Sequence, residues 1–112
     1  MNGNDPSYLQ GEIVEERIEF TLVELCHITG ASRDDFARWV EEGAFEPQGA
    51  RMEEWRFSGT CVRRAITAQH LTADLEVNAP GVALALDLLD QIAALRKRLA
   101  RYGDRGEVSG AP

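Results

Sequence analysis

The chain has 112 residues and a mass of 12.4 kDa, a length that suits one domain and excludes most large enzyme folds. Hydrophobic residues make up 44% and charged residues 28%, so the chain has enough apolar material for a core and is not wholly disordered. The net charge of −7 is concentrated in residues 1–57, which hold 13 acidic and 5 basic residues, whereas residues 58–112 hold 6 and 7. A negative surface of this kind repels phosphate backbones and favours basic partners.

The two ends of the chain have a composition that predicts disorder. Residues 1–12 and 103–112 are rich in Gly, Asn, Asp and Pro and show no hydrophobic periodicity. We therefore expect a disordered tail at each end of a single domain that spans residues 13–102.

Export and membrane insertion are not expected from this sequence. The first twenty residues lack the basic and apolar regions of a signal peptide. The longest nearly apolar run, Val82–Leu89, is far shorter than the ~20 residues that span a bilayer. Cys26 and Cys61 each lie in an apolar helical pattern, so we expect buried, reduced thiols in a cytoplasmic protein.

Two short segments, Arg17–Phe20 and Glu54–Phe57, alternate polar and apolar residues with the period of a half-buried strand. We expect them to pair as a small two-stranded sheet. Because side chains two apart on a strand point the same way, the apolar residues should share one inward face. The predicted members of that face are Ile18, Phe20, Trp55 and Phe57.

A helical pattern begins at Thr21, directly after the first predicted strand. Thr21 followed three residues later by Glu24 predicts a capping box, in which each side chain binds the other residue's free backbone N–H. Leu22, Leu25 and Cys26 give this helix its apolar side. A helix of about two turns should therefore end at Gly30.

A second short helix is predicted directly after the first. Ser32 is its expected N-cap, and Gly43 supplies the left-handed residue that stops it. Two short helices around a Thr-Gly-Ala-Ser turn indicate a helix-turn-helix, and the loop Glu46–Met52 before a short strand is what a winged version needs. Helix pairs with a glycine turn also occur as plain scaffolding, and this alternative stays open here.

A third helix is predicted from Ser58, as its cap, to about Val77. Its apolar side should carry Cys61, Ala65, Ala68 and Leu75. The run Asn78–Gly81 then breaks the helix, because Pro80 suits the first turn of a new helix and restricts the residue before it.

The fourth predicted helix, about Pro80–Tyr102, has two apolar rows. The first row, called the seam below, follows a three-four heptad spacing and consists of Ala85, Leu88, Ile92, Leu95, Leu99 and Tyr102. The second row consists of Val82, Leu86, Leu89 and Ala93, roughly 110° away. One small domain can hardly cover both rows, so we expect the second row to meet another chain. The candidates for self-association are Leu88, Ile92, Leu95, Leu99 and Tyr102.

Three segments carry a likeness to a known family: FTLVELCHITGASRDDFARWVEEGAFEP, WRFSGTCVRRAITAQHL and VNAPGVALALDLLDQIAALRKRL. Over about residues 17–102 the chain resembles the bacterial chaperone modulator family CbpM, most specifically at Pro80–Ile92. The resemblance implies a mainly α fold: a MerR-like winged helix-turn-helix with a small two-stranded β element and a long C-terminal helix. It also implies a cytoplasmic homodimer that binds the J-domain of the DnaJ-like co-chaperone CbpA and inhibits it by competing with the Hsp70 chaperone DnaK.

The acidic first half has the sign that complements the basic helix of a J-domain. Acidic groups on polar faces are therefore the candidates for partner binding, although such groups often do no more than solvate a surface. The candidates are Glu41, Glu42, Glu53, Glu54, Asp87 and Asp90.

A MerR-type DNA-binding transcriptional regulator is the alternative that the fold suggests. A recognition helix needs Arg, Lys, Asn or Gln to contact phosphates and base edges. The segment Ser32–Glu42 offers Arg33 and Arg38 against four acidic residues, a net charge of −2 that disfavours docking in a DNA groove. The four are Asp34, Asp35, Glu41 and Glu42.

Catalysis and metal binding are not expected. Adjacent Cys26 and His27 cannot both point at one ion from a regular helix, and there is no Cys-x2-Cys pair. The other Cys and His residues that a metal site would need are Cys61 and His70. Neither histidine has a partner in a nucleophile motif, and no phosphate-binding glycine loop follows a strand. We predict no enzyme activity, no metal and no cofactor.

Overall fold

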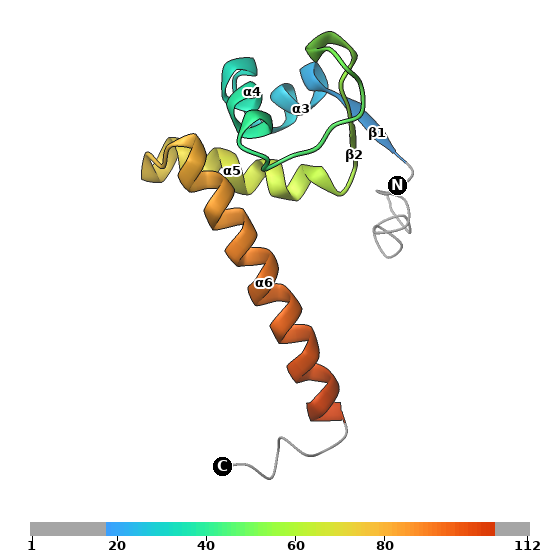
Figure 1. The fold of residues 1–112 in the computed structure, drawn as a ribbon, viewed down its shortest axis with the longest axis vertical. Coiled ribbons are helices and arrows are strands. Elements are labelled where there is room, and N and C mark those ends of the chain that lie inside the picture. The colour runs from blue at the N-terminus through green and yellow to red at the C-terminus, as the bar shows by residue number, and fades with distance from the viewer. Residues whose placement is uncertain (1–17, 105–112) are drawn as a thin grey trace, which may run out of the picture.

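The computed structural model describes residues 18–104 (Figure 1). The predicted tails lie outside the described residues, except that Gly103 and Asp104 belong to the last helix. The elements are, in chain order, β1 (Glu19–Thr21), α3 (Leu22–Thr29), α4 (Arg33–Glu41), the 3-10 turn η1 (Met52–Glu54), β2 (Arg56–Ser58), α5 (Cys61–Leu75) and α6 (Ala79–Asp104). The mainly helical fold with one small antiparallel sheet is confirmed.

The first helix of the helix-turn-helix, α3, begins and ends as predicted. The backbone N–H of Thr21 donates to Glu24 Oε1 at 2.8 Å, and the N–H of Glu24 donates to Thr21 Oγ1 at 3.1 Å. Both halves of the capping box are therefore present. Gly30 ends the helix with a φ of +83°, a left-handed conformation that favours glycine.

The second helix, α4, also has the predicted ends. Ser32 Oγ accepts a hydrogen bond of 3.0 Å from the backbone N–H of Asp35. Gly43 has a φ of +83° and donates to the Val40 carbonyl at 3.0 Å, while the next residue donates to the Trp39 carbonyl at 2.9 Å. These two bonds satisfy carbonyls at the end of the helix and turn the chain towards the wing.

The two strands pair antiparallel, with Phe20 opposite Phe57. The wing is closed below its tip by two backbone hydrogen bonds of 2.9 Å between Gln48 and Arg56. Phe57 is buried, and Phe20 and Trp55 are half-buried against the core. The prediction of an inward face is wrong for Ile18, which is 41% exposed because it lies at the open end of the sheet, beyond the last strand pair.

An aromatic cluster forms the centre of the core. The ring of Phe36 lies 4.8 Å from Trp39, 5.8 Å from Phe45 and 5.9 Å from Phe57, measured between centroids. All four side chains are at most 3% exposed. The cluster joins α4, the loop that follows it and β2, so the wing is packed against the helix-turn-helix. The other buried core residues are Leu22, Leu25, Ala31, Ala44, Ala65, Ala68, Val82 and Leu86.

The third predicted helix differs from α5 at both ends. Ser58 remains in β2 and its Oγ accepts from the backbone N–H of Thr60 at 3.0 Å, so Thr60 and not Ser58 is the N-cap. The helix ends at Leu75, before Val77, and Glu76 follows with a φ of +55°. Leu75 is 67% exposed, so its predicted place on the buried side is wrong; it lies in the last turn, beyond the buried Ala65 and Ala68.

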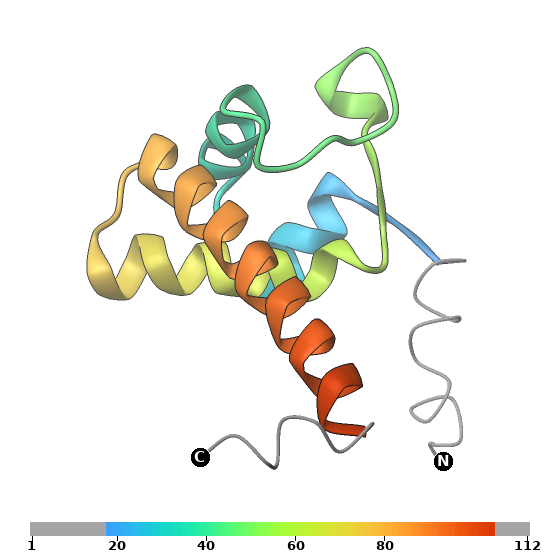
Figure 2. The ribbon, with the colours of Figure 1, turned by 60° about the horizontal axis from the view of Figure 1, so that its bottom comes forward.

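The last helix, α6, crosses α5 (Figure 2) and packs on the rest of the fold only through its first turns, as its departure from the head in Figure 1 shows. It begins as predicted, with Asn78 Oδ1 accepting from the N–H of Gly81 at 2.8 Å and Pro80 in the first turn. Val82 and Leu86 are buried against α4 and α5. The expectation that their row meets another chain is therefore wrong for these two residues.

Beyond Leu86, the helix leaves the body of the molecule. Residues 87–103 are all exposed. We call residues 18–86 the head and residues 87–104 the arm. The principal extents of 53 × 37 × 27 Å reflect the length of the arm. Within the described part of the chain, no helix is long and apolar enough to cross a membrane.

Removing the central ring of the core should destabilise the fold strongly. We expect Phe36→Ala to lower the free energy of unfolding by about 3–5 kcal/mol, because the remaining rings cannot close the cavity. Urea unfolding followed by circular dichroism measures this at a fixed protein concentration. The control is Ile66→Ala on the partly exposed side of α5, with a change under about 1 kcal/mol. Equal losses for the two variants would contradict the position of Phe36.

A glycine in the wing should be harder to replace than one at a helix end. Gly49 has a φ of +114°, and a Cβ there would lie 2.6 Å from the Glu54 carbonyl oxygen. Gly30 also has a positive φ, but a Cβ there would meet nothing within 4 Å. We expect Gly30→Ala to cost about 1 kcal/mol and Gly49→Ala more than about 2 kcal/mol in urea unfolding. Similar losses of unfolding free energy for the two variants would contradict the close approach of the Glu54 carbonyl to Gly49.

Candidate functional site

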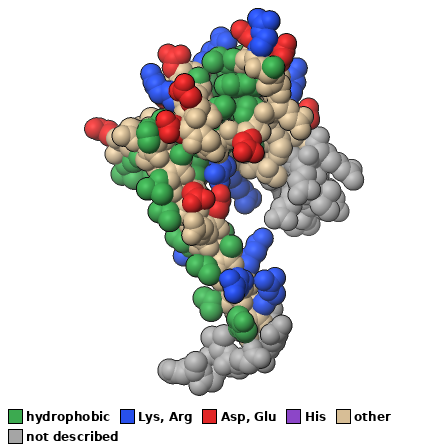
Figure 3. All heavy atoms as spheres, viewed as in Figure 1, with side chains coloured by type: hydrophobic (Ala, Val, Ile, Leu, Met, Phe, Trp, Pro, Cys, Tyr) green, Lys and Arg blue, Asp and Glu red, His purple; other side chains and the backbone are tan. Residues whose placement is uncertain are grey.

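The six acidic candidates lie on three different elements. Glu41 and Glu42 lie at the C-terminal end of α4, two more belong to η1 in the wing, and two belong to α6. All six are exposed. Among residues 18–104, no hydrogen bond or ion pair links one of these pairs to another. In Figure 3, acidic groups appear at several places on the head and at the base of the arm.

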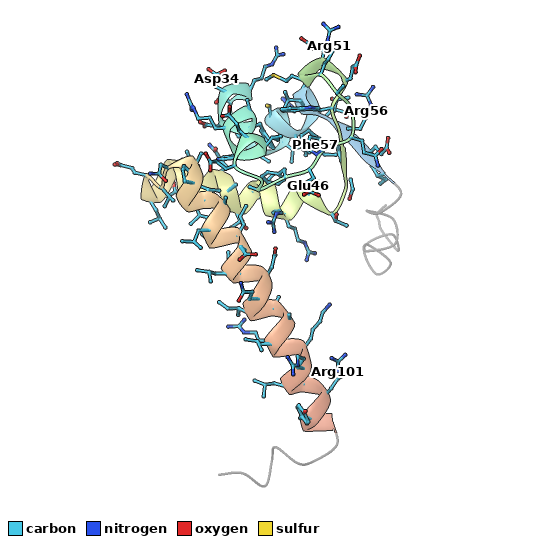
Figure 4. All side chains as sticks on the ribbon, viewed as in Figure 1. Asp34, Glu46, Arg51, Arg56, Phe57 and Arg101 are labelled. Atoms are coloured by element: carbon cyan, nitrogen blue, oxygen red, sulfur yellow. The ribbon has the colours of Figure 1, made fainter. Side chains whose placement is uncertain are left out.

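Carboxylates of the helix-turn-helix and the wing engage the arginines nearby. Arg38 Nη1 lies 3.3 Å from Asp35 Oδ1 on α4, and Arg51 Nε lies 3.7 Å from Glu53 Oε1 in the wing. Figure 4 shows Asp34 on α4 and Arg51 at the tip of the wing, both pointing into solvent on the same side of the head. Exposed pairs of this kind are weak and screened by salt. Their effect is to offset positive charge where a DNA-binding protein would present it.

Asp90 differs from the other five candidates because the head already binds it. Arg64 of α5 donates to Asp90 Oδ2 at 2.7 Å and, through Nε, to the Ala44 carbonyl at 2.9 Å. The same guanidinium lies 5.9 Å from the centroid of the Phe45 ring. Arg64 thus connects the loop after α4 to the start of the arm. No local sequence pattern predicts this role for Arg64, since its partners lie 20 and 26 residues away.

Asp87 is the other acidic candidate on α6. Its Oδ2 accepts a hydrogen bond of 3.0 Å from Gln91 Nε2, one turn along the same helix. The residue is exposed. Both carboxylates are exposed, but Asp87 is bonded only along its own helix, whereas Asp90 is bonded to α5.

The seam is an apolar stripe on the side of the arm that faces away from the head. Its residues from Leu88 onward are between 43% and 60% exposed. Figure 3 shows these hydrophobic side chains along one edge of the arm and Lys and Arg side chains along the other. A continuous row of large apolar side chains in solvent marks an interaction surface. The exposed members are Leu88, Ile92, Leu95, Leu99 and Tyr102.

The cysteines and histidines are dispersed over the fold. Burial raises the pKa of Cys26, opposed by the nearby charge of Arg33. Burial likewise raises the pKa of Cys61, although a backbone hydrogen bond and Arg64 act in the opposite direction. Both thiols therefore hold their proton at neutral pH. Within residues 18–104, no three His, Cys, Asp or Glu side chains are grouped so that they could hold a metal ion.

Comparisons with known proteins agree with the fold. The model of a family described as MerR HTH family regulatory protein matches residues 20–102. Chaperone modulatory protein CbpM of Coxiella burnetii (strain Dugway 5J108-111) is 37% identical over 91 residues, which cover 81% of this chain and 86% of the relative. Chaperone modulatory protein CbpM of Escherichia coli O139:H28 (strain E24377A / ETEC) is 34% identical over 95 residues, 76% of this chain and 91% of the relative.

Both the match to the family model and the matches to these relatives extend across the helix-turn-helix, the wing and the long helix. The names belong to regulators and not to enzymes. The chain therefore belongs to the MerR helix-turn-helix family and, with its relatives, to the CbpM family of chaperone modulators.

Proposed function

We propose that this chaperone modulator binds the J-domain of a DnaJ-like co-chaperone of the CbpA type and inhibits its work with DnaK. The observation that carries the proposal is the charge of the head. Glu41, Glu42, Glu53 and Glu54 are exposed on the two elements, α4 and the wing, that would face DNA in a DNA-binding protein. Such a surface suits the basic helix of a J-domain.

Inhibition by occlusion follows from this arrangement. A J-domain held on the acidic head cannot present the same basic face to DnaK, so inhibition depends on the relative concentrations and affinities of the two competitors. Charged groups at the rim of an interface mainly raise the association rate and its dependence on salt. Asp87 can add to this surface, whereas Asp90 would first have to release Arg64.

The same charges argue against the alternative, a transcriptional regulator that reads DNA. Arg38 and Arg51, two of the residues available for phosphate contacts, each lie beside a carboxylate. A DNA backbone approaching α4 and the wing would meet Glu41, Glu42 and Glu53 as well. No observation on the described residues favours this function over J-domain binding.

We also propose that the protein is a homodimer joined through the seam. A stripe of leucine and isoleucine at heptad spacing gains free energy when a matching stripe covers it, and a second copy supplies one. The head covers only the opposite side of α6, through Val82 and Leu86. The cytoplasm is the compartment this proposal requires, since J-domain co-chaperones and DnaK operate there.

Binding to the J-domain should depend on the acidic residues of the head. We expect calorimetric titration of the full chain with the same organism's CbpA J-domain to show a complex that weakens by about tenfold or more between about 50 and about 500 mM NaCl. Glu41→Gln with Glu42→Gln, and separately Glu53→Gln with Glu54→Gln, should each weaken it several-fold.

The matched control for these variants removes two carboxylates elsewhere on the head. This control is Asp74→Asn with Glu76→Gln. Both residues lie at the end of α5, so the affinity for the J-domain should stay within about twofold. An absence of binding at protein concentrations on the order of tens of micromolar in low salt would sink the J-domain proposal. A sequence-specific gel shift with DNA would support the alternative function.

Charges placed in the seam should separate the dimer. We expect sedimentation equilibrium to give the mass of two chains for the unaltered protein and of one chain for Leu95→Asp with Leu99→Asp, because four buried carboxylates cannot pair across the interface. Leu75→Asp, at an exposed leucine outside the seam, is the control and should remain dimeric. A dimer that persists in the double variant, or an unaltered protein that is monomeric, would refute the role of the seam.

A further inference from the structure

The angle between α5 and the arm holds a basic surface that the proposed function does not use. A groove of about 270 Å³ lies between α5 and the start of the arm, and Arg63, Arg64 and Leu86 are among its lining residues. Figure 3 shows Lys and Arg side chains in the notch between head and arm and again further down the arm on the same side. Figure 4 places Arg101 on that side.

Helix geometry continues this surface along the arm. Lys97 follows Leu86 by eleven residues, which is three turns, so it lies on the side of α6 that faces the head. Arg101 follows Asp90 by the same interval and lies on the side where Asp90 meets Arg64. We call the surface formed by Arg63, Arg64, Lys97 and Arg101 the basic elbow.

Positive charge predominates in the basic elbow. The one carboxylate among the groove's lining residues is Asp90, and Arg64 already neutralises it at 2.7 Å. Arg63, Lys97 and Arg101 are exposed, and no ion pair involves them within residues 18–104. Arg63 at the groove, with Lys97 and Arg101 further along the arm, attracts a chain that carries several carboxylates.

We propose that the basic elbow binds the acidic N-terminal segment of this same chain, residues 5–16. This segment holds Asp5, Glu12, Glu15 and Glu16 and no basic residue. It complements the elbow in charge without any need for a second protein. The inference is independent of the J-domain proposal, because it uses the opposite charge on a different face of the molecule.

The described fold begins close to the elbow. The carbonyl of Ile18 accepts a hydrogen bond of 2.9 Å from the N–H of Gly59, so the chain enters the fold beside the start of α5. Arg63 lies one turn further along α5. Six residues of extended chain span about 20 Å and thirteen span about 45 Å, so the groove is within reach of Glu12 and the arm within reach of Asp5.

Because the acidic segment is covalently joined to the fold, weak attraction is sufficient for it to bind the basic elbow. A short linker holds the carboxylates at an effective concentration in the millimolar range, so a few screened ion pairs can keep the elbow occupied. The seam stays accessible, because Lys97 lies nine residues from Leu88, two and a half turns, and therefore on the opposite side of α6. Occupation of the elbow is thus compatible with dimerisation.

The sequence allows a direct test, because Lys97 is the only lysine in the chain. A carbodiimide joins an amine to a carboxylate in contact with it and adds no spacer. We expect treatment of the full chain to link Lys97 to Asp5 or Glu12, as identified by mass spectrometry of the digested monomer band. Lys97→Arg keeps the charge but removes the amine, so the link should vanish.

A mixture of nitrogen-14 and nitrogen-15 labelled chains shows whether the link forms within one chain. Links within one chain carry a single isotope and support the proposal. Links found only between chains would assign the elbow to a second copy and overturn it. Links only from Lys97 to Asp87, Asp90 or Asp104 on its own helix, or no link at all, would also overturn it.

The contribution of the elbow's charge is tested with a pair of matched variants. Arg63→Gln with Arg101→Gln should reduce the yield of the link several-fold, as should raising NaCl to about 500 mM. Arg33→Gln with Arg38→Gln removes the same charge from α4 and should leave the yield unchanged. Equal yields in both variants would show that proximity alone, and not the basic elbow, brings the segment to Lys97.

Discussion

The contact of Phe36 with three other buried rings is the interaction on which the rest of the molecule depends. Trp39 comes from the same helix, Phe45 from the loop that leaves it, and Phe57 from the strand that ends the wing. Each ring contributes a large apolar area in a chain with little core to spare. Because the cluster joins α4 to the wing, the exposed carboxylates of both elements keep a fixed relation on one head.

The sides of the long helix α6 lie in different surroundings, so each forms a different surface. Its first turns complete the core through Val82 and Leu86, and Arg64 holds the following turn through Asp90. Beyond this point one side of the arm is apolar and the opposite side is basic (Figure 3). The packing of Val82 and Leu86 against α4 and α5 sets the angle between α5 and the arm, and the bond from Arg64 to Asp90 adds to it. The basic surface between α5 and the arm depends on that angle.

Local signals predicted the helix-turn-helix well because helix ends depend on neighbouring residues. The helix ends are formed by hydrogen bonds between residues at most five positions apart. They comprise the capping box at Thr21, the N-cap at Ser32 and the bonds at the left-handed glycines that follow the two helices. Errors arose where burial depended on distant elements. The periodicity that predicted Ile18 and Leu75 to be buried is present, but no element within residues 18–104 covers either side chain.

Local bonding, residue pattern and composition were enough to predict the order and type of the elements, the family and the sign of the head's charge. It also showed that α6 carries more apolar surface than one small domain covers. Which of the two rows the head covers depends on how α6 packs: Val82 and Leu86 meet α4 and α5, while the seam meets solvent. The bonds of Arg64 likewise depend on tertiary packing, because no periodicity connects it to partners 20 and 26 residues away.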